Sequence, residues 1–449
     1  MRGDWTKALA AAGFAAEEAA AKERLAAAAT EALARVTSRE PTAACWVPGR
    51  LELFGTHTDY AGGRTLVAAL PRGFIFTGAA RRDGDVRVID AIAGEQVVVH
   101  PAHGEGPAGG WRRYAVTVVQ RLARNFPDAP IGADVSFASD LPQAAGMSSS
   151  SALMVGLAVT LIRLSGIRRS AAWRENIASA VDEAGYYACI ENGRDFRALA
   201  GDAGVGTHGG SEDHAAMLCS TPGGFTALSF VPMRLLTTAP LPDGWSCIVA
   251  STGVAAEKTG GALDAYNRLS SGAARLLELA NRGNEEFASL AAALASPSGR
   301  QRLQERLETV EVTGWSVEAL RNRMRHFVRE DARIPLAVDA LRKGDAPQMR
   351  ELGAQSQSDS DLLLGNQVPE TNALSTLALD HGAFASRSFG AGFGGSVWAI
   401  VDRAKASDFA ARWRAAYHSR LPARVLTVFG ARPGYAMVEL GRADGLEAS

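Results

Sequence analysis

A stretch of 22 residues, 141–162, contains no charged side chain and constrains the fold more than any other part of the chain. Its length would suit a membrane span, but Pro142, Gln143, Gly146 and four consecutive serines interrupt it, so we exclude a span. The preceding residues 133–137 have a strand pattern, and 152–164 predict a buried helix. The run therefore predicts a strand, a loop of small residues and a buried helix in succession.

The loop within residues 140–153 has the composition of a phosphate cradle. Small residues let backbone N–H groups approach a ligand, and the start of the following helix supplies free N–H groups and a partial positive charge. Serine hydroxyls can add donors or a metal ligand. A helix N-cap beside a solvated loop explains the same residues, and the Walker pattern is absent, so this segment alone leaves both interpretations open.

The remaining sequence mixes helical and strand patterns, which predicts an α+β fold. Helices are expected at 4–36, 111–126, 171–192 and over most of 261–345. Strands are expected at 45–55 (around a turn), 86–89, 95–99, 225–230, 245–250, 397–401 and 424–428, with a glycine-rich loop at 193–211. The proline-rich stretch 239–244 is the best candidate for a domain joint, dividing the chain into 1–238 and 239–449, although a surface loop would look the same.

The composition narrows the class of protein. In 449 residues, 47 basic and 48 acidic side chains leave a net charge of −1, which argues against a nucleic-acid coat or an anionic membrane partner. The four cysteines have no zinc spacing and are too sparse for a disulfide scaffold, so we expect a reducing cytoplasm. The first residues lack an apolar segment, so no signal peptide is expected.

A second cluster of polar residues lies between glycines at 48–63. Arg50, Thr56, His57 and Asp59 are crowded together there. Such a turn can present several hydrogen-bonding groups to a polyhydroxylated ligand. A structural turn with a surface ion pair is the simpler explanation of this cluster on its own.

Two more glycine-rich segments carry polar groups. Residues 206–214 bring two histidines together with Glu212 and Asp213 in a spacing that fits no standard zinc motif. An acid there could orient or deprotonate a hydroxyl, and Ser211 could equally cap a helix. Residues 388–396 contain a Gly-x-Gly-like run without the strand and helix of a dinucleotide fold, which favours close approach to another backbone or to a phosphate.

These four clusters, in this order, resemble the GHMP family of small-molecule kinases, and most of all its galactokinase branch. Residues 48–60 follow the motif Pro-Gly-Arg-x-Asn-x-Ile-Gly-Glu-His-Thr-Asp-Tyr, and 141–152 follow Leu-Pro-x-Gly-x-Gly-Leu-Ser-Ser-Ser-Ala. Residues 390–395 read Gly-Ala-Gly-Phe-Gly-Gly, as in the family, and 210–214 match Gly-x-x-Asp-Gln. The resemblance spans residues 45 to about 435.

The resemblance implies ATP-dependent phosphoryl transfer to a sugar hydroxyl, which in galactokinases is the anomeric C1 hydroxyl. It implies a two-domain α+β fold, with a ribosomal protein S5 domain 2-like N-terminal domain, a ferredoxin-like C-terminal domain and the active site in the cleft between them. It also implies a monomeric enzyme whose partners are a sugar and ATP.

The resemblance further assigns roles to individual residues. Asp213 is the acid that orients or deprotonates the attacking hydroxyl, and Arg50 lies beside the transferring phosphate. Ser150 and Glu191 hold Mg²⁺. The ATP phosphates are wrapped by Ala144, Ala145, Gly146, Met147, Ser148, Ser149, Ser150 and Ser151. The sugar is contacted by Glu52, Thr56, His57, Asp59, Gly210 and Tyr266.

Four departures from the family pattern bear on the substrate. Thr56 replaces a glutamate that in the family reaches the C6 hydroxyl, so a uronic acid (galacturonate or glucuronate) or the pentose arabinose is an alternative to galactose. Glu52 replaces the usual asparagine. Ala144 replaces a glycine, which is tolerable if its φ is negative. About ten extra residues at 193–203 form either a lid or a surface excursion.

Two further functions compete with a sugar kinase. One is a kinase for another alcohol, such as mevalonate or homoserine, but the His-Thr-Asp-Tyr segment at 57–60 argues against it. The other is a sugar- and ATP-binding sensor without activity. The presence of Arg50, Asp213 and the serine loop favours catalysis.

Overall fold

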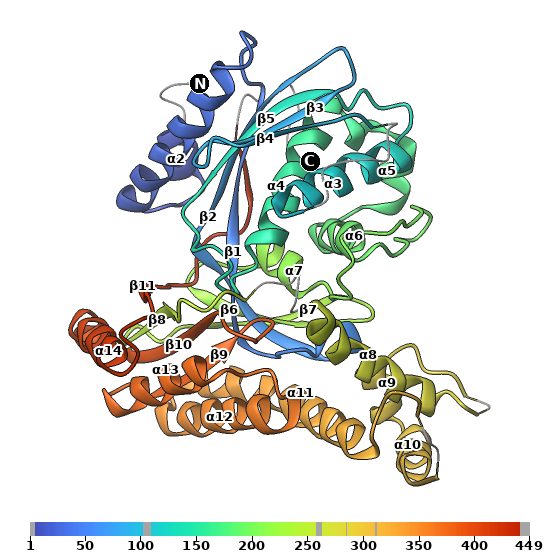
Figure 1. The fold of residues 1–449 in the computed structure, drawn as a ribbon, viewed down its shortest axis with the longest axis vertical. Coiled ribbons are helices and arrows are strands. Elements are labelled where there is room, and N and C mark those ends of the chain that lie inside the picture. The colour runs from blue at the N-terminus through green and yellow to red at the C-terminus, as the bar shows by residue number, and fades with distance from the viewer. Residues whose placement is uncertain (1–4, 102–108, 257–262, 284, 310–311, 441–449) are drawn as a thin grey trace.

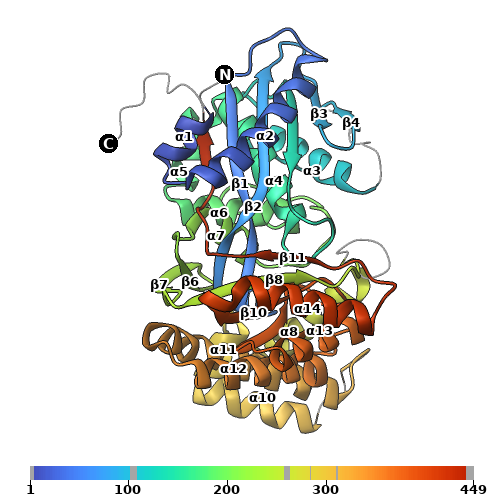
Figure 2. The same ribbon diagram turned by 90° about the vertical axis from the view of Figure 1, so that its left-hand side faces the viewer.

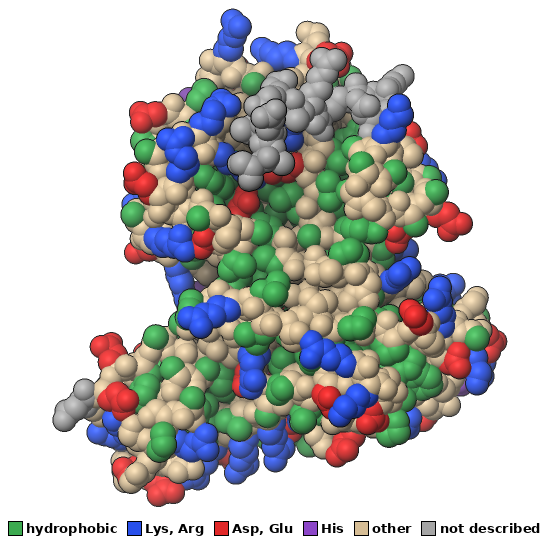
Figure 3. Space-filling view, turned by 180° about the vertical axis from the view of Figure 1, so that it is seen from behind, with side chains coloured by type: hydrophobic (Ala, Val, Ile, Leu, Met, Phe, Trp, Pro, Cys, Tyr) green, Lys and Arg blue, Asp and Glu red, His purple; other side chains and the backbone are tan. Residues whose placement is uncertain are grey.

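The computed structural model describes residues 5–101, 109–256, 263–283, 285–309 and 312–440. They form two units, each built around one sheet, stacked along the long axis of the molecule (Figure 1). The α+β fold predicted from the sequence is confirmed. Figure 3 shows acidic and basic side chains over the back of both units, in keeping with a net charge near zero.

The upper unit contains an eight-stranded sheet. Its central path runs β12-β1-β2-β5-β3-β4, and β6 and β7 extend it from the far end of β2. The strands are β1 (Ala43–Phe54), β2 (Arg64–Ala80), β3 (Val86–Asp90), β4 (Gln96–Val99), β5 (Ala133–Ser139), β6 (Gly224–Ser229), β7 (Arg234–Pro240) and β12 (Val438–Leu440). All pairings are antiparallel except β3 with β5.

Helices cover both faces of this sheet (Figure 2). The N-terminal helices α1 (Trp5–Ala11) and α2 (Ala16–Ala34) pack on one face through a small apolar cluster around Trp46. The opposite face is covered mainly by four helices: α3 (Trp111–Asn125), α4 (Ser149–Ser165), α6 (Ala180–Asn192) and α7 (Glu212–Cys219). Helix α4 packs against β1 and β2 and is covered by its helical neighbours, so most of its apolar residues are buried.

The lower unit has a four-stranded antiparallel sheet in the order β11-β8-β10-β9. Its strands are β8 (Trp245–Ser251), β9 (Ala385–Phe389), β10 (Ser396–Asp402) and β11 (Thr427–Gly430). Helices α13 (Pro369–Asp380) and α14 (Ala406–Arg420) share an apolar cluster with this sheet. The remaining helices are α8 (Leu263–Ala280), α9 (Leu290–Ala295), α10 (Pro297–Thr309), α11 (Val317–Lys343) and α12 (Ala346–Asp359).

The proposed domain joint can now be placed on the structure. The boundary 238/239 lies inside β7, two residues before that strand ends, and residues 241–244 lead directly into the second sheet. One strand departs from a simple division, because β12 returns from the C-terminal part to pair with β1. We keep 1–238 and 239–449 as the proposed domains, with β12 as an exchanged strand.

Several elements differ from the sequence predictions, each for a local reason. The single helix expected at 4–36 is two helices, because Gly13 adopts φ +92° between them. The helix expected at 171–192 is also divided, into α5 (Ala171–Asn176) and α6, which begins after Ser179 accepts a hydrogen bond from the Asp182 N–H. The turn expected near Pro48 is an irregularity in pairing within the long strand β1.

Candidate active site

A pocket forms where three segments of the upper unit meet the first helix and a loop of the lower unit. Segments from each of three predicted polar clusters reach it, at residues 50–60, 207–214 and 390–391. The complete lining is Arg50, Glu52, His57, Asp59, Tyr60, Glu191, Asn192, Thr207, Gly209, Gly210, Glu212, Asp213, His214, Tyr266, Gly390 and Ala391. The fourth cluster, the serine loop, joins this pocket through Arg50, whose Nη1 donates to the Gly146 carbonyl at 3.3 Å.

The structure brings Arg50 and Asp213 into direct contact. Arg50 projects from β1 and Asp213 from the first turn of α7, and Asp213 Oδ1 lies 2.8 Å from Arg50 Nε and 2.6 Å from Nη2. Burial alone would lower the pKa of Arg50, but the carboxylates of Asp213, Glu212 and Glu52 outweigh it and raise the pKa. Arg50 is therefore a permanent positive charge on a buried side chain.

Glu212 adds a second buried carboxylate beside the same guanidinium, with Oε1 3.1 Å from Arg50 Nε. Burial raises the pKa of Glu212 well above its ordinary value, and the charge of Glu52 raises it further, against the attraction of Arg50. Two of the acids around Arg50 therefore compete for one cation, and Asp213 has the closer contact.

Ser151 lies between Asp213 and Glu191, and His214 lies beside Glu191. The buried Ser151 hydroxyl donates to Glu191 Oε2 at 2.8 Å and lies 3.3 Å from Asp213 Oδ2. His214 Nε2 lies 3.2 Å from the same oxygen of Glu191. The hydroxyl that contacts Glu191 is thus that of Ser151, while Ser150 is half-buried in the first turn of α4.

The serine loop closes against the glycine-rich segment of the lower unit. The Met147 carbonyl accepts from the Arg50 N–H, and the Ala145 carbonyl accepts from the Ser396 hydroxyl. Gly390 has φ +83°, and a β-carbon there would lie 2.7 Å from the Gly146 oxygen, so the close approach requires glycine. Ala144 has φ +46°, so the condition of a negative φ at this position is not met, and the loop carries a strained alanine.

Four of the six residues assigned to the sugar lie together on one wall, where His57 and Tyr266 have ring centroids 5.7 Å apart. Asp59 Oδ2 accepts from the Glu212 N–H at 3.0 Å. A β-carbon on Gly210 would lie only 2.1 Å from that same oxygen, so this residue must be glycine. The wall comprises His57, Asp59, Gly210 and Tyr266.

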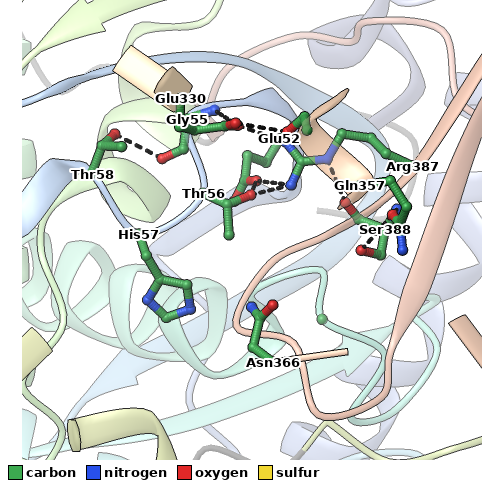
Figure 4. A network of polar contacts seen from close by, with 12 residues as sticks. Glu52, Gly55, Thr56, His57, Thr58, Glu330, Gln357, Asn366, Arg387 and Ser388 are labelled. Atoms are coloured by element: carbon green, nitrogen blue, oxygen red, sulfur yellow. Dashed lines mark hydrogen bonds and ion pairs between the residues drawn. The ribbon is translucent and has the colours of Figure 1, made fainter. Parts of the chain in front are cut away.

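Thr56 does not line the pocket, which differs from the position expected for a sugar contact. Its side chain is buried in the polar network of Figure 4, where it donates to Glu52 Oε1 and accepts from Arg387 Nη2. Glu52 does line the pocket. The threonine at position 56 therefore does not leave the pocket without an acid here, because Glu52, four residues earlier on strand β1, places a carboxylate on the lining.

The additional residues at 193–203 pack against the upper unit and take no part in the pocket. The Arg194 carbonyl accepts from Arg121 Nη2 at 2.7 Å, and the Ala200 carbonyl accepts from Asn125 Nδ2 at 3.0 Å. These contacts favour the surface excursion over the lid.

Comparisons with known proteins agree with this geometry. Three family models match: the galactokinase galactose-binding signature at residues 34–80, the GHMP kinases N terminal domain at 113–193 and the GHMP kinases C terminal at 337–419. A galactokinase from Streptomyces coelicolor is 30% identical over 380 residues, covering 81% of this chain and 86% of that protein. This chain belongs to the galactokinase branch of the GHMP kinases.

Further relatives of this galactokinase-family chain support the assignment. A galactokinase from Chloroflexus aggregans is 28% identical and covers 87% of this chain and 91% of its own length. The solved structure of Lactococcus lactis galactokinase complexed with galactose has a TM-score of 0.72 at 21% identity, covering 92% of this chain and 99% of that one. Mevalonate kinase from Methanococcus jannaschii has a TM-score of 0.55 at 13% identity, covering 88% and 99%, so the two-unit kinase fold is confirmed.

Some residues of this family member's site were missed by sequence reasoning. Glu330 and Arg387 belong to no motif, yet both are fully buried charges in the network next to the pocket. The sequence Ala-Ser-Arg-Ser-Phe at 385–389 gave no signal of burial, and only the folded strand, whose five residues are all buried, shows that this arginine requires a partner. Glu212, His214 and Tyr60 lay inside the predicted clusters without an assigned role.

Proposed function

We propose that this galactokinase-family chain transfers the γ-phosphoryl group of ATP to the anomeric C1 hydroxyl of galactose or a closely related neutral sugar. The contact between Arg50 and Asp213, at the mouth of the serine loop, carries this proposal. Asp213 would accept a hydrogen bond from the attacking hydroxyl or take its proton, and Arg50 would neutralise charge on the transferring group. Such a transfer needs positioning and charge neutralisation rather than a covalent nucleophile.

The serine loop has the features required to hold ATP phosphates. Helix α4 begins directly after the loop, so its first N–H groups and its positive dipole end face that region. The buried Ser148 Oγ has no hydrogen-bond partner among the described residues, and a phosphate oxygen would satisfy it. We therefore assign residues 144–151 to the phosphates.

Mg²⁺ would be held mainly by substrate oxygens, with Glu191 and an adjacent serine of the loop as protein ligands. Within the described ranges no group of three or more His, Cys, Asp or Glu side chains forms a metal site. Mg²⁺ commonly takes only one or two carboxylates together with phosphates, so this sparse donor set fits. When bound, the ion would neutralise phosphate charge. Ser150 and Ser151 are both candidates, and Ser151 already contacts Glu191.

The charge of the pocket favours a neutral sugar. In the described part of the chain five acidic side chains line it, against a single arginine. They are Glu52, Asp59, Glu191, Asp213 and Glu212, and burial raises the pKa of the last. A uronic acid would add a further negative charge among them, which costs binding energy unless a cation compensates. The uronate alternative is therefore disfavoured.

We also propose a cytoplasmic location and a monomeric state for this chain. Among the residues with a described structure, no helix is both long enough and apolar enough to span a bilayer. All four cysteines are free thiols, which is consistent with the reducing cytoplasm we propose. A monomer remains our expectation.

An ADP-release assay across sugars tests the proposed reaction. We expect turnover with galactose to exceed turnover with galacturonate and glucuronate by at least about 100-fold, because like charges brought together cost several kcal/mol. Arabinose, fucose and N-acetylgalactosamine complete the panel, and phosphorus NMR identifies the C1 phosphate. If no sugar stimulates ADP release, the kinase assignment fails and the sensor alternative takes its place.

The role of the serine loop predicts a defect for Gly390→Ala. The new methyl would meet the Gly146 oxygen and displace the loop, so we expect the KM for ATP to rise by roughly tenfold or more, since shifts of about 1 Å are costly in a positioned site. Gly84→Ala is the matched control, because Gly84 has φ +84° and nothing within 4 Å of an added β-carbon. Equal KM values for the two variants would contradict the predicted contact.

A further inference from the structure

Glu52 and Thr56 differ from the family motif in a coordinated way. The motif has asparagine and glutamate at these positions, whereas this chain has glutamate and threonine. The number of carboxylates in the segment is therefore unchanged, and the carboxylate has moved four residues toward the N-terminus. The two side chains are in direct contact, since the Thr56 hydroxyl donates to Glu52 Oε1.

The buried Arg387 contacts both Glu52 and Thr56. It is fully buried, and Nη1 donates to Glu330 Oε1 at 2.9 Å, while Nη2 reaches Thr56 Oγ1 and lies 3.4 Å from Glu52 Oε1 (Figure 4). Glu330 is shared with Arg333, whose Nη1 lies 2.8 Å away. Arg333 also pairs with Asp359, so Glu330 and Asp359 already balance Arg333 and Arg387, and Glu52 is a further acidic contact of Arg387.

The two oxygens of Glu52 have different surroundings. Oε1 is occupied by Thr56 and Arg387, on the side of the lower unit. For Oε2 the charged partner recorded in the described structure is Arg50 Nη1, at 3.9 Å, which is too long for a hydrogen bond. Because Glu52 lines the pocket, Oε2 retains capacity to accept a hydrogen bond from a ligand there.

We propose that Glu52 is the specificity-determining residue of the sugar pocket. Its Oε2 accepts a hydrogen bond from a sugar hydroxyl, while Thr56 and Arg387 hold Oε1 and thereby fix the orientation of the carboxylate. The same charge repels a substrate that carries a carboxylate at that position. This inference rests on the proposed function and adds to it the side chain, Glu52, that distinguishes one sugar from another.

Glu52→Gln separates charge from shape. The amide keeps the size of the side chain but loses its charge, so we expect the KM for galactose to rise by roughly tenfold or more while kcat changes less, the pattern of lost uniform binding. The ratio of galactose to galacturonate turnover should fall by roughly tenfold in the same variant. Glu183→Gln is the matched control, because it makes the same change at a carboxylate that pairs with Arg168 outside the pocket.

The double variant Glu52→Asn with Thr56→Glu keeps the test decisive if the single variants fold poorly. It returns the carboxylate to the motif position, so Arg387 keeps its acidic partner. Thr56→Glu alone would place two carboxylates in contact, and we expect a lower melting temperature than for the double variant. Retention of the wild-type galactose KM in the double variant is the expected result, and its loss would contradict sugar binding by a carboxylate in this segment.

The outcomes separate this inference from the proposed function. Galactose turnover by the wild-type chain tests the function, and a thermal shift with galactose tests sugar binding without turnover. If the wild type phosphorylates galactose but Glu52→Gln changes neither the galactose KM nor the galacturonate ratio, the role of Glu52 is refuted. A change confined to melting temperature would likewise reduce Glu52 to a structural partner of Arg387.

Discussion

Replacing Asp213 by asparagine is expected to lower kcat by roughly 10²–10⁴-fold, the range typical of a lost general base. Asparagine has nearly the same shape, and its oxygen can still accept from Arg50, which now lies 2.6–2.8 Å from the Asp213 oxygen. What disappears is the negative charge that orients the sugar hydroxyl or takes its proton. ATP binding should persist, because the serine loop is unchanged.

Steady-state kinetics would measure kcat, and calorimetric titration would measure the affinity for ATP. Asp331→Asn provides the control, because Asp331 also pairs with an arginine, Arg64, but outside the pocket. It makes the same chemical change and should leave kcat within about twofold, as is usual for substitutions away from a site. An Asp213→Asn variant that retained a tenth of wild-type kcat would contradict the role of Asp213.

Replacing Arg387 by methionine is expected to destabilise the protein by about 3–5 kcal/mol, the cost of breaking a buried ion pair from one side. Arg387 is fully buried, and its removal leaves Glu330 and Glu52 without their shared cation. Burial would raise the pKa of Glu330, but Arg387 and Arg333 outweigh it and hold the pKa at about 2. The loss would be measured as a shift of the urea unfolding midpoint at neutral pH.

The destabilisation caused by Arg387→Met should become smaller as the pH falls. Because the folded-state pKa of Glu330 lies below its ordinary value of 4.5, its ionised form stabilises the fold above that pH. That contribution disappears as the pH falls toward 2, so the difference between wild type and Arg387→Met should shrink over this range. Adding Glu330→Gln to the variant should recover part of the stability, since it removes a buried charge that has lost one of its two cationic partners.

An exposed ion pair provides a comparison for the stability cost of Arg387→Met. Arg412 and Asp408 form an exposed pair on α14, with 3.2 Å between nitrogen and oxygen. Arg412→Met should cost about 0.5 kcal/mol or less, as is typical of exposed helical pairs. Equal effects for Arg387→Met and Arg412→Met would mean that the buried network adds little to stability.

Local patterns predicted many elements of the fold. The small-residue loop before an apolar run became the loop before α4, and the alternating segments near 86–89 and 95–99 became β3 and β4. The 17-residue strand β2 was missed. Both faces of its sheet are covered by helices, so its sequence shows no alternation of polar and apolar residues.

The candidate site was predictable to the extent that its chemistry resides in short motifs. The choice of Arg50, His57, Asp59 and Asp213 follows from the resemblance of the ordered clusters to the family motifs. The direction of the Thr56 side chain did not follow, because it depends on Arg387, 331 positions later in the chain. Nor did the contact of Ser151 with Glu191, which depends on how α4 and α6 pack.

The available chemical groups and the order of the motifs can be read from the amino-acid sequence alone. Which of those groups meet depends on the folded chain path, because buried charged side chains from distant segments must pair where that path brings them together. The charge at position 52 illustrates the difference: read alone it is a substitution, and beside Arg387 and Thr56 it is the acidic partner of a buried guanidinium.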